Sequence, residues 1–369
     1  VKPGRSAALV LSLSLHESVT NYSSCSQPYH SLDSRVCAAE QILRVMKRAL
    51  DSAALSAGVK RRLRPRVLLG GLCFGEGPRW CDSDQRLYFS DMHARQVIAV
   101  DMRGNRETLA TLPEKVSGFP NAGPSGLGFG PDGNLLAVSM ADRRVVNIGK
   151  VGPPVEVADL SKIATFHCND MVVDSVGRAY VGNFGWNIYE AKCAQKSANL
   201  ALITPSKTGS YGKPRVVAKD LAFPNGMAIS ADGKSLVVAE TWAARLSAYD
   251  IAPDGGLSGR RVWADLSATG VPDGICRFDA EGCIWVAVPL GPNFAGPGCC
   301  ARVAPGGEIG EKIETAPFGA YACALGGARG RTLFILEAMS HMPGQTGPGN
   351  ARIRTVEVGV PRAEGQARP

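Results

Sequence analysis

Six positions that recur along the chain open similar short segments, and four of them carry side chains suited to a hard metal ion. The six residues are Glu76, Ser125, Asn169, Asn225, Asp273 and Tyr321. The two acids and two asparagines supply oxygen ligands, which Ca²⁺ and Mg²⁺ prefer and which Mn²⁺ and Zn²⁺ also accept. The pattern predicts one divalent metal ion, with Ca²⁺ as the first choice and Glu76, Asn169, Asn225 and Asp273 as its ligands.

A second interpretation applies to each pair taken alone, because Asn-Gly and Asp-Gly are common turn sequences. Turn chemistry does not explain why Glu, Asn, Asn and Asp occupy the same position of successive repeats. An evident turn, residues 131–133 (Pro-Asp-Gly), lies elsewhere in its repeat. We therefore favour metal binding, and we expect one of the two carboxyl groups to have a raised pKa when no cation is present.

Short β-strands in six similar units must position these residues. The second residues of the units are separated by 49, 44, 56, 48 and 48 positions. Periods of about 40–50 residues with several short strands are typical of propeller blades. The units lack the helical segment or the hexapeptide spacing of a solenoid. The sequence thus predicts an all-β, six-bladed β-propeller over residues 67–360, in which the six recurring residues face one central channel.

The remaining chain differs in composition. Residues 1–66 hold eleven Lys or Arg and four acids, which gives +7 of the total net charge of +8. This basic excess lies in a leader and not on a folded face, so we do not expect nucleic-acid binding. We expect residues 1–66 to form a basic extension that is partly helical or disordered, and residues 361–369 to form a C-terminal tail.

The cysteine content and the hydropathy indicate in which cellular compartment the protein is expected. Eleven cysteines, with no CxxC pair, fit neither a zinc site nor a disulfide scaffold, and they favour a reducing, cytoplasmic compartment. No apolar run reaches the roughly 20 residues that cross a bilayer, so no membrane association is expected. Residues 7–15 weakly resemble a signal peptide, but no convincing cleavage site follows them. Nothing in the sequence specifies an oligomeric state.

Four ordered motifs resemble those of the senescence-marker-protein/gluconolactonase family, which includes regucalcin and bacterial sugar lactonases. The resemblance covers about residues 68–357 and rests on residues 75–80 (Gly-Glu-Gly-Pro-Arg-Trp), 169–170 (Asn-Asp), 224–226 (Pro-Asn-Gly) and 272–274 (Pro-Asp-Gly). It implies that Glu76, Asn225 and Asp273 are metal ligands. It also implies that Asn169 contacts the metal or the substrate, and that Asp273 is the general base.

One departure from the family concerns the substrate. Many members have an arginine that binds the sugar two residues before the Asn169 position, where this chain has His167. His167 is either a substrate-binding residue or an ordinary residue of the channel wall, and its presence puts gluconolactone in doubt as the preferred substrate.

Two further features are candidates near the channel. Phe184 and Trp186 follow a strand of the Asn169 unit, where they either stack on a substrate ring or pack at the edge of a blade. We interpret Glu240 as a solvated acid at the end of a strand rather than as a residue that orients a ligand.

The chemistry expected of this set is metal-assisted hydrolysis of a small-molecule substrate, a sugar lactone or a similar cyclic ester. The cation would polarise the carbonyl group while Asp273 activates water. The alternatives are a phosphotriesterase-like hydrolase with the same site, and a non-catalytic propeller that binds calcium or acts as a scaffold. A lyase-like propeller resembling strictosidine synthase is disfavoured, because that likeness does not carry the full ligand set.

Overall fold

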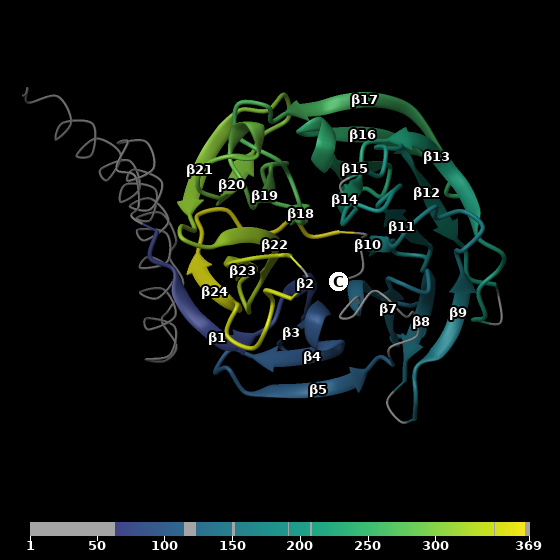
Figure 1. The fold of residues 1–369 in the computed structure, drawn as a ribbon, viewed down its shortest axis with the longest axis horizontal. Helices are drawn as coiled ribbons and strands as arrows, with labels where there is room; N and C mark the ends of the chain where they lie inside the picture. Colours follow the sequence, from purple (N-terminus) through teal and green to yellow (C-terminus); the bar gives the residue numbers. More distant parts are fainter. Residues whose placement is uncertain are drawn as a thin grey trace, which may run out of the picture. The chain divides into compact units, whose positions relative to one another are not determined.

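The computed structural model describes residues 63–113, 123–149, 152–190, 192–206, 209–342 and 344–365. The chain divides into two units, Val1–Arg62 and Leu63–Pro369. The first unit lies outside the described residues, and with it most of the predicted N-terminal extension. The described part of the second unit is built from six four-stranded antiparallel sheets arranged around a central axis (Figure 1). This architecture confirms the predicted six-bladed β-propeller.

Each blade is one sheet whose strands follow one another from the channel outward. Blades 1 to 3 comprise β2 (Gly75–Cys81), β3 (Arg86–Asp91), β4 (Gln96–Asp101) and β5 (Arg106–Thr111); β6 (Pro124–Phe129), β7 (Leu135–Ser139), β8 (Arg144–Ile148) and β9 (Val155–Asp159); and β10 (Cys168–Val173), β11 (Ala179–Asn183), β12 (Ala198–Ile203) and β13 (Arg215–Leu221). Blades 4 and 5 comprise β14 (Pro224–Ile229), β15 (Ser235–Glu240), β16 (Arg245–Ile251) and β17 (Leu257–Asp265); and β18 (Ile275–Phe278), β19 (Ile284–Val288), β20 (Cys299–Val303) and β21 (Ile309–Glu314).

The sixth blade joins the two ends of the propeller. Its inner strands are β22 (Gly319–Gly326), β23 (Thr332–Ala338) and β24 (Ala351–Glu357), and its outermost strand is β1 (Arg66–Leu72) from the start of the described chain. β1 pairs with β24 in antiparallel register, with Arg66 opposite Thr355. A strand from the beginning of the chain therefore completes the last sheet and closes the ring.

The strands differ in composition according to their distance from the axis. The second strands, such as β15 and β19, are nearly continuous apolar runs that are buried on both faces, because neighbouring blades cover them on each side. The outermost strands, such as β5 and β17, are mostly exposed and carry Arg and Glu or Asp side chains. This gradient explains why the sequence shows six short apolar repeats separated by polar segments.

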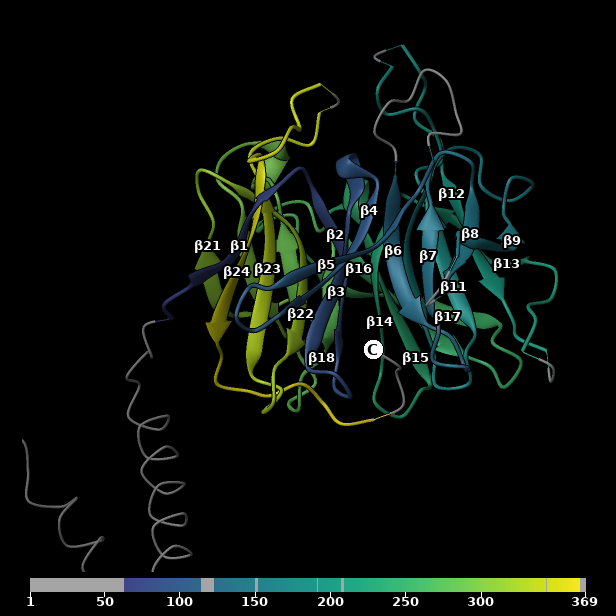
Figure 2. The ribbon, with the colours of Figure 1, turned by 90° about the horizontal axis from the view of Figure 1, so that it is seen from below.

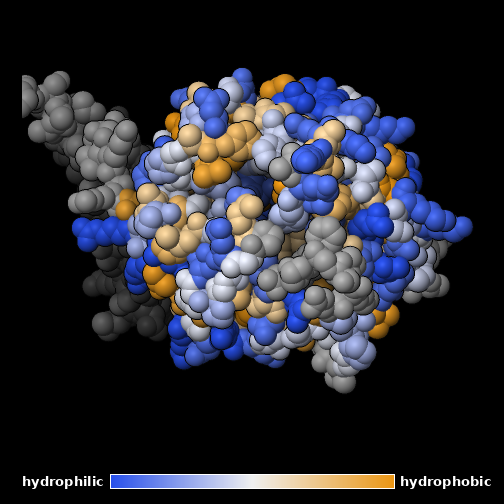
Figure 3. All heavy atoms as spheres, viewed as in Figure 1, coloured by the Kyte–Doolittle hydropathy of each residue, from blue (hydrophilic) through white to orange (hydrophobic). Residues whose placement is uncertain are grey.

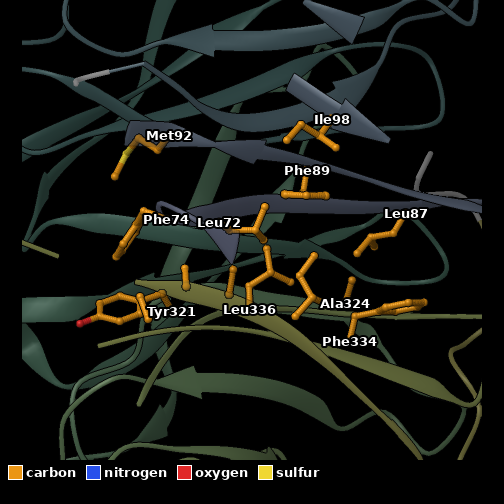
Figure 4. Packing of buried hydrophobic residues seen from close by; sticks show 14 of the residues in the cluster. Leu72, Phe74, Leu87, Phe89, Met92, Ile98, Tyr321, Ala324, Phe334 and Leu336 are labelled. Carbon is orange, nitrogen blue, oxygen red and sulfur yellow. The ribbon is translucent and has the colours of Figure 1, made fainter. Parts of the chain in front are cut away.

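The seam between blades 1 and 6 is packed with aromatic and aliphatic side chains (Figure 4). Trp80 of blade 1 stacks on Phe334 of blade 6, with ring centroids 5.4 Å apart and an interplanar angle of 22°. Phe74 and Tyr321 lie at one end of the same cluster, with ring centroids 4.7 Å apart. The apolar core is therefore continuous with the aromatic side chains near the channel.

The C-terminal segment after β24 crosses one face of the propeller (Figure 2). The backbone nitrogen of Ala280 donates to the carbonyl oxygen of Pro361 over 2.8 Å, and that of Ala363 donates to Phe278 over 2.8 Å. Arg362 also forms an ion pair with Asp82 of blade 1. Residues 361–363, which we had predicted to belong to a tail, are thus bonded to blades 5 and 1. No helix within the described ranges is long and apolar enough to span a bilayer.

Candidate active site

The recurring residues predicted from the sequence meet in the central channel. Glu76, Asn169, Asn225, Asp273 and Tyr321 all line one cavity with a volume of about 130 Å³. The sixth residue, Ser125, is fully buried, and its hydroxyl points toward Asn169 Oδ1 at 3.4 Å. The rotation of equivalent positions around the axis therefore brings together the four predicted ligand residues from blades 1, 3, 4 and 5.

Local backbone irregularities aim these residues at the channel. In every inner strand the pairing register shifts near the recurring position, as between Glu76 and Arg79 or between Pro224 and Met227. Such bulges bend a strand and redirect its side chains. The sequence pattern did not predict these bulges, although they recur with the same period as the blades.

Glycine follows the recurring residue in four of the six blades because adjacent inner strands touch there. The backbone nitrogen of Gly226 donates to the carbonyl oxygen of Asp273 over 3.2 Å. A Cβ atom on Gly226 would lie only 2.3 Å from the backbone nitrogen of Ile275. The Asn-Gly pair at 225–226 thus lies in an inner strand and serves close packing between blades, and it is not a turn.

Two acids share the cavity without a charged partner of opposite sign in its described lining. Burial raises the pKa of Glu76 well above its usual range, and repulsion from Asp273 and Asp170 adds to the rise. Burial also raises the pKa of Asp273, with repulsion from Asp170 adding and a hydrogen bond with Asn225 opposing. Low polarity and like charge therefore oppose ionisation of both acids, whereas the sequence leads us to expect a raised pKa for one of them.

The two asparagines present their amide groups to the same cavity. Nδ2 of Asn225 donates to Thr241 Oγ1 over 3.1 Å, so one N–H of the amide is held at Thr241. Nδ2 of Asn169 is buried and has no hydrogen-bond partner among the described residues. Two carboxylates and two amides, with one amide held in place, form a set of oxygen donors that fits a hard divalent cation.

The donor set is not rich in charged ligands. No group of three or more His, Cys, Asp or Glu side chains within the described ranges has an arrangement that could hold a metal ion by itself. The donor atoms that the four residues present to the cavity are the oxygens of two carboxylates and two amides. This composition favours Ca²⁺ and Mg²⁺, which accept neutral oxygen ligands, over metals that prefer imidazole or thiolate.

Asp170, which follows Asn169 in β10, is a third acid that is not among the residues lining the cavity and whose role the sequence did not reveal. It is buried, its Oδ1 has no hydrogen-bond partner among the described residues, and burial raises its pKa to about 6, against the opposing charge of Arg79. Arg79 is held by a hydrogen bond to the carbonyl oxygen of Met171. A sequence signal existed, because Asp170 occupies a position at which four other blades have glycine.

The other predicted residues lie at different depths around the cavity. Phe184 lines the cavity, whereas Trp186 is not among the lining residues and packs against Phe223 with ring centroids 6.2 Å apart. His167 is buried and stacks on Phe166 at 4.1 Å, and it is not among the residues that line the cavity. Burial, together with the nearby charge of Arg143, lowers the pKa of His167 to about 4, so its imidazole is neutral at physiological pH.

Glu240 differs from its predicted environment. The interpretation as a solvated acid is wrong, because the side chain is completely buried. Its carboxylate accepts hydrogen bonds from the backbone nitrogen of Ala222 at 2.8 Å and from Ser247 Oγ at 2.5 Å, and it pairs with Arg245 and Arg260. Glu240 therefore ties β15 to its neighbours and does not reach the cavity.

Comparisons with known proteins agree with the fold and with the motifs. The family described as "SMP-30/Gluconolactonase/LRE-like region" matches residues 74–339. The chain is 26% identical to a 6-deoxy-6-sulfogluconolactonase of Pseudomonas putida over 71% of this chain and 82% of that protein. It is 25% identical to a pentonolactonase of Haloferax volcanii over 77% of this chain and 88% of that protein. Its fold resembles that of the calcium-binding protein regucalcin of Agrobacterium tumefaciens, with a TM-score of 0.64 and 20% identity. The likeness covers 83% of this chain and 98% of that protein.

Proposed function

The chain belongs to the SMP-30/gluconolactonase/LRE-like family, and from this premise we propose that it opens a lactone or a similar cyclic ester with the help of one divalent metal ion. The observation that carries the proposal is the convergence of Glu76, Asn169, Asn225 and Asp273 in one cavity of the channel. Relatives named for lactone hydrolysis support the same reaction class.

Glu76, Asn225 and Asp273 would hold the cation, and Asn169 would stand beside it. When bound, the cation would act as a Lewis acid that polarises the ester carbonyl and stabilises the negative charge that develops on its oxygen. Ca²⁺ is the first choice because the donors are carboxylate and amide oxygens, with Mg²⁺, Mn²⁺ and Zn²⁺ as the ions to compare with it.

Asp273 would accept the proton of the attacking water. The water oxygen forms a bond with the carbonyl carbon, the ring C–O bond breaks, and the proton held by Asp273 passes to the leaving ring oxygen, giving a hydroxy acid. A cation beside Asp273 would favour its ionised form, so the carboxylate would be ready to accept that proton. Burial, which raises the pKa of Asp273 in the metal-free protein, would oppose this effect.

Asn169 would position the substrate. Its buried Nδ2 lacks a partner among the described residues, so a substrate oxygen that accepts this hydrogen bond would satisfy it. Glu76 would serve as a ligand only, because Asp273 is the acid that we assign to proton transfer. A cytoplasmic location stays a prediction from the cysteine content.

Lactone hydrolysis by chelator-treated protein tests the proposal, with Ca²⁺, Mg²⁺, Mn²⁺ or Zn²⁺ added back one at a time. We expect no turnover without metal and clear turnover with at least one ion. Metal binding without opening of any lactone would favour a phosphotriesterase-like activity, tested next with phosphotriesters, or a non-catalytic calcium-binding propeller. Failure to bind any of the four ions would refute the metal site.

A further inference from the structure

The candidate cavity has a largely apolar wall. Eleven of its nineteen described lining residues are aromatic or aliphatic, and none of the nineteen is Arg, Lys, Gln or Ser. On the face shown in Figure 3, the centre of the molecule is hollowed and hydrophobic residues gather beside the hollow. A ligand rich in hydroxyl groups needs many hydrogen-bond partners when it is buried, and an apolar wall does not supply them.

Four aromatic residues form one continuous side of the cavity, which we call the aromatic wall: Phe184, Phe223, Trp242 and Phe294. Phe184 stacks on Phe223 with ring centroids 4.6 Å apart, and Trp242 lies 4.8 Å from Phe294. Phe223 and Trp242 connect the two pairs, with centroids 5.9 Å apart. Blades 3, 4 and 5 thus contribute rings to a single surface.

Two residues of the aromatic wall are held in an unfavourable backbone conformation. Phe223 has φ of 64° and Phe294 has φ of 59°, the left-handed region that bulky residues rarely adopt. Asn293 before Phe294 also has a positive φ of 55°. Such strain concentrates at functional sites. Here it places two aromatic rings against the cavity.

The outer end of the aromatic wall faces solvent. Trp242 is 37% exposed and Phe294 is 44% exposed, although both are large apolar side chains. Contiguous exposed apolar patches mark surfaces that a ligand or partner covers, and these two rings lie side by side with centroids 4.8 Å apart. Packing in the core does not explain the position of these two rings.

The polar groups outside the donor set are few and partly engaged. The hydroxyl of Thr241 accepts the hydrogen bond of Asn225, and Tyr321 Oη is bonded to His341 Nδ1 at 3.2 Å. Tyr189 adds one further hydroxyl to the described lining. These few polar groups are enough for a ligand with one ester group at the metal, but not for a ligand with many further polar groups.

We propose that the substrate is a lactone or cyclic ester that carries an alkyl or aryl substituent, which packs on the aromatic wall, and not a polyhydroxylated sugar lactone. The inference rests on the proposed function for the reaction and adds the chemical class of the substrate. The ester group lies at Asn169 and Asp273, and the substituent extends past Phe223 toward Trp242 and Phe294.

Three lactones of equal ring size test this class with the full-length, metal-loaded protein. They are δ-valerolactone without a substituent, δ-decalactone with a pentyl chain, and glucono-δ-lactone with hydroxyl groups. After correction for spontaneous hydrolysis, we expect kcat/KM for δ-decalactone to exceed that for glucono-δ-lactone by at least about 100-fold, because each buried methylene contributes and each unpartnered hydroxyl costs binding. A higher kcat/KM for glucono-δ-lactone would overturn the inference.

Variants at the exposed end of the aromatic wall separate its role from folding. Trp242→Ala and Phe294→Ala should each lower kcat/KM for δ-decalactone by about 10-fold and change that for δ-valerolactone by less than about 3-fold. Val262→Ala on β17 is the control, because Val262 is 59% exposed and does not line the cavity. Equal losses on both lactones would show that the wall does not bind the substituent.

Failure of the proposed function remains distinguishable from failure of this inference. If the metal-loaded protein opens none of the three lactones, the proposed lactone hydrolysis fails. Quenching of tryptophan fluorescence then decides the class of ligand. Tighter binding of δ-decalactone than of glucono-δ-lactone, weakened by Phe294→Ala, would uphold an apolar site, and the reverse order would refute it.

Discussion

Nδ2 of Asn225 donates a hydrogen bond to Thr241 Oγ1 over 3.1 Å, and both side chains are buried. Asn225 belongs to β14, whereas Thr241 begins the short 3-10 helix η2 (Thr241–Ala243) directly after β15. The contact holds one N–H of the amide at Thr241 and so restrains the orientation of the Asn225 side chain. Thr241 thereby positions a predicted metal ligand of its own blade without occupying the recurring position that revealed that ligand.

Replacement of Thr241 by valine should weaken metal binding. The variant keeps the shape of the side chain but removes the oxygen that accepts from Asn225, so the amide is free to rotate. Partners that orient ligands typically contribute about 10–100-fold to metal affinity, and we expect a loss in this range for Thr241→Val. Calorimetric titration with Ca²⁺ measures it. Thr241→Ser retains the hydroxyl and should restore most of the affinity; an unchanged affinity in Thr241→Val would contradict the positioning role.

The pH dependence of stability should reveal the acid pair. Burial and repulsion raise the pKa of Glu76 and Asp273 in the native state, so the native protein binds protons more tightly than the unfolded chain. Their favourable contribution is therefore present at low pH and is lost as the pH rises from the unfolded pKa values, about 4, through the raised native values. The neutral variant Glu76→Gln should lose less stability over this window in chelator. Urea unfolding between about pH 5 and 8 measures both proteins.

A bound cation should reverse this dependence. Protons and the cation compete for the same carboxylates, so Ca²⁺ should stabilise the wild-type protein more at pH 8 than at pH 5. The Glu76→Gln protein should gain less from Ca²⁺ at both values. If the stability of the two proteins changes with pH in the same way, both with and without Ca²⁺, the placement of Glu76 beside the cation would be contradicted.

Loss of Glu240 should destabilise the fold and not only the site. Burial alone would raise its pKa, but hydrogen bonds from Ala222, Ser247 and two arginines lower it, so its stabilising effect is present at neutral pH and is lost as the pH falls. Glu240→Ala would leave buried donors without a partner and should cost about 3–5 kcal/mol of unfolding free energy. Glu156→Ala is the control, because Glu156 is 51% exposed and its pair with Arg144 should contribute less than about 1 kcal/mol. Similar losses of unfolding free energy in Glu240→Ala and Glu156→Ala would contradict the role of Glu240 in holding the fold together.

The period of the repeats was sufficient to predict the six blades and the meeting of Glu76, Asn169, Asn225 and Asp273. Each blade repeats the same strand order, so one shared position in the sequence becomes one shared region in space. The electrostatic attraction between Asp170 and Arg79 could not be predicted in this way, because the two residues belong to different blades and follow no local pattern. Thr241, His341 and Phe294 reach the cavity from segments between strands, which vary from blade to blade.

The environment of Glu240 shows a second limit of sequence reasoning. An acid at the end of a strand is usually solvated, and only its partners distinguish a buried one. Those partners, Arg245 and Arg260, come from β16 and β17. A regular repeat therefore predicts architecture and the axis-facing residues, whereas ion pairs between strands depend on register shifts, such as that between Leu246 and Ser247, that the sequence does not reveal.

Removal of the first strand should open the propeller. β1 supplies the outermost strand of blade 6 and pairs with β24, so a protein lacking residues 1–72 has an incomplete last blade. We expect it to lose cooperative thermal unfolding and metal binding. The matched control lacks residues 1–62 only, keeps β1, and should retain lactone hydrolysis. Full activity without β1 would show that closure of the ring by this strand is dispensable.

Substitution of Asp273 by asparagine should separate proton transfer from folding. The amide preserves the size of the side chain and one oxygen ligand, and it relieves the repulsion that Asp170 and Glu76 experience. The metal-free variant should therefore be at least as stable as the wild-type protein at neutral pH. Because an amide cannot accept the proton of water, kcat should fall by about 100-fold or more at every pH, within the range typical of general-base catalysis. Lactone hydrolysis at saturating metal measures the loss, and a Ca²⁺ titration verifies that the ion is bound. If the variant binds the ion and retains full turnover, another group must activate the water, and Asp273 would be a ligand only.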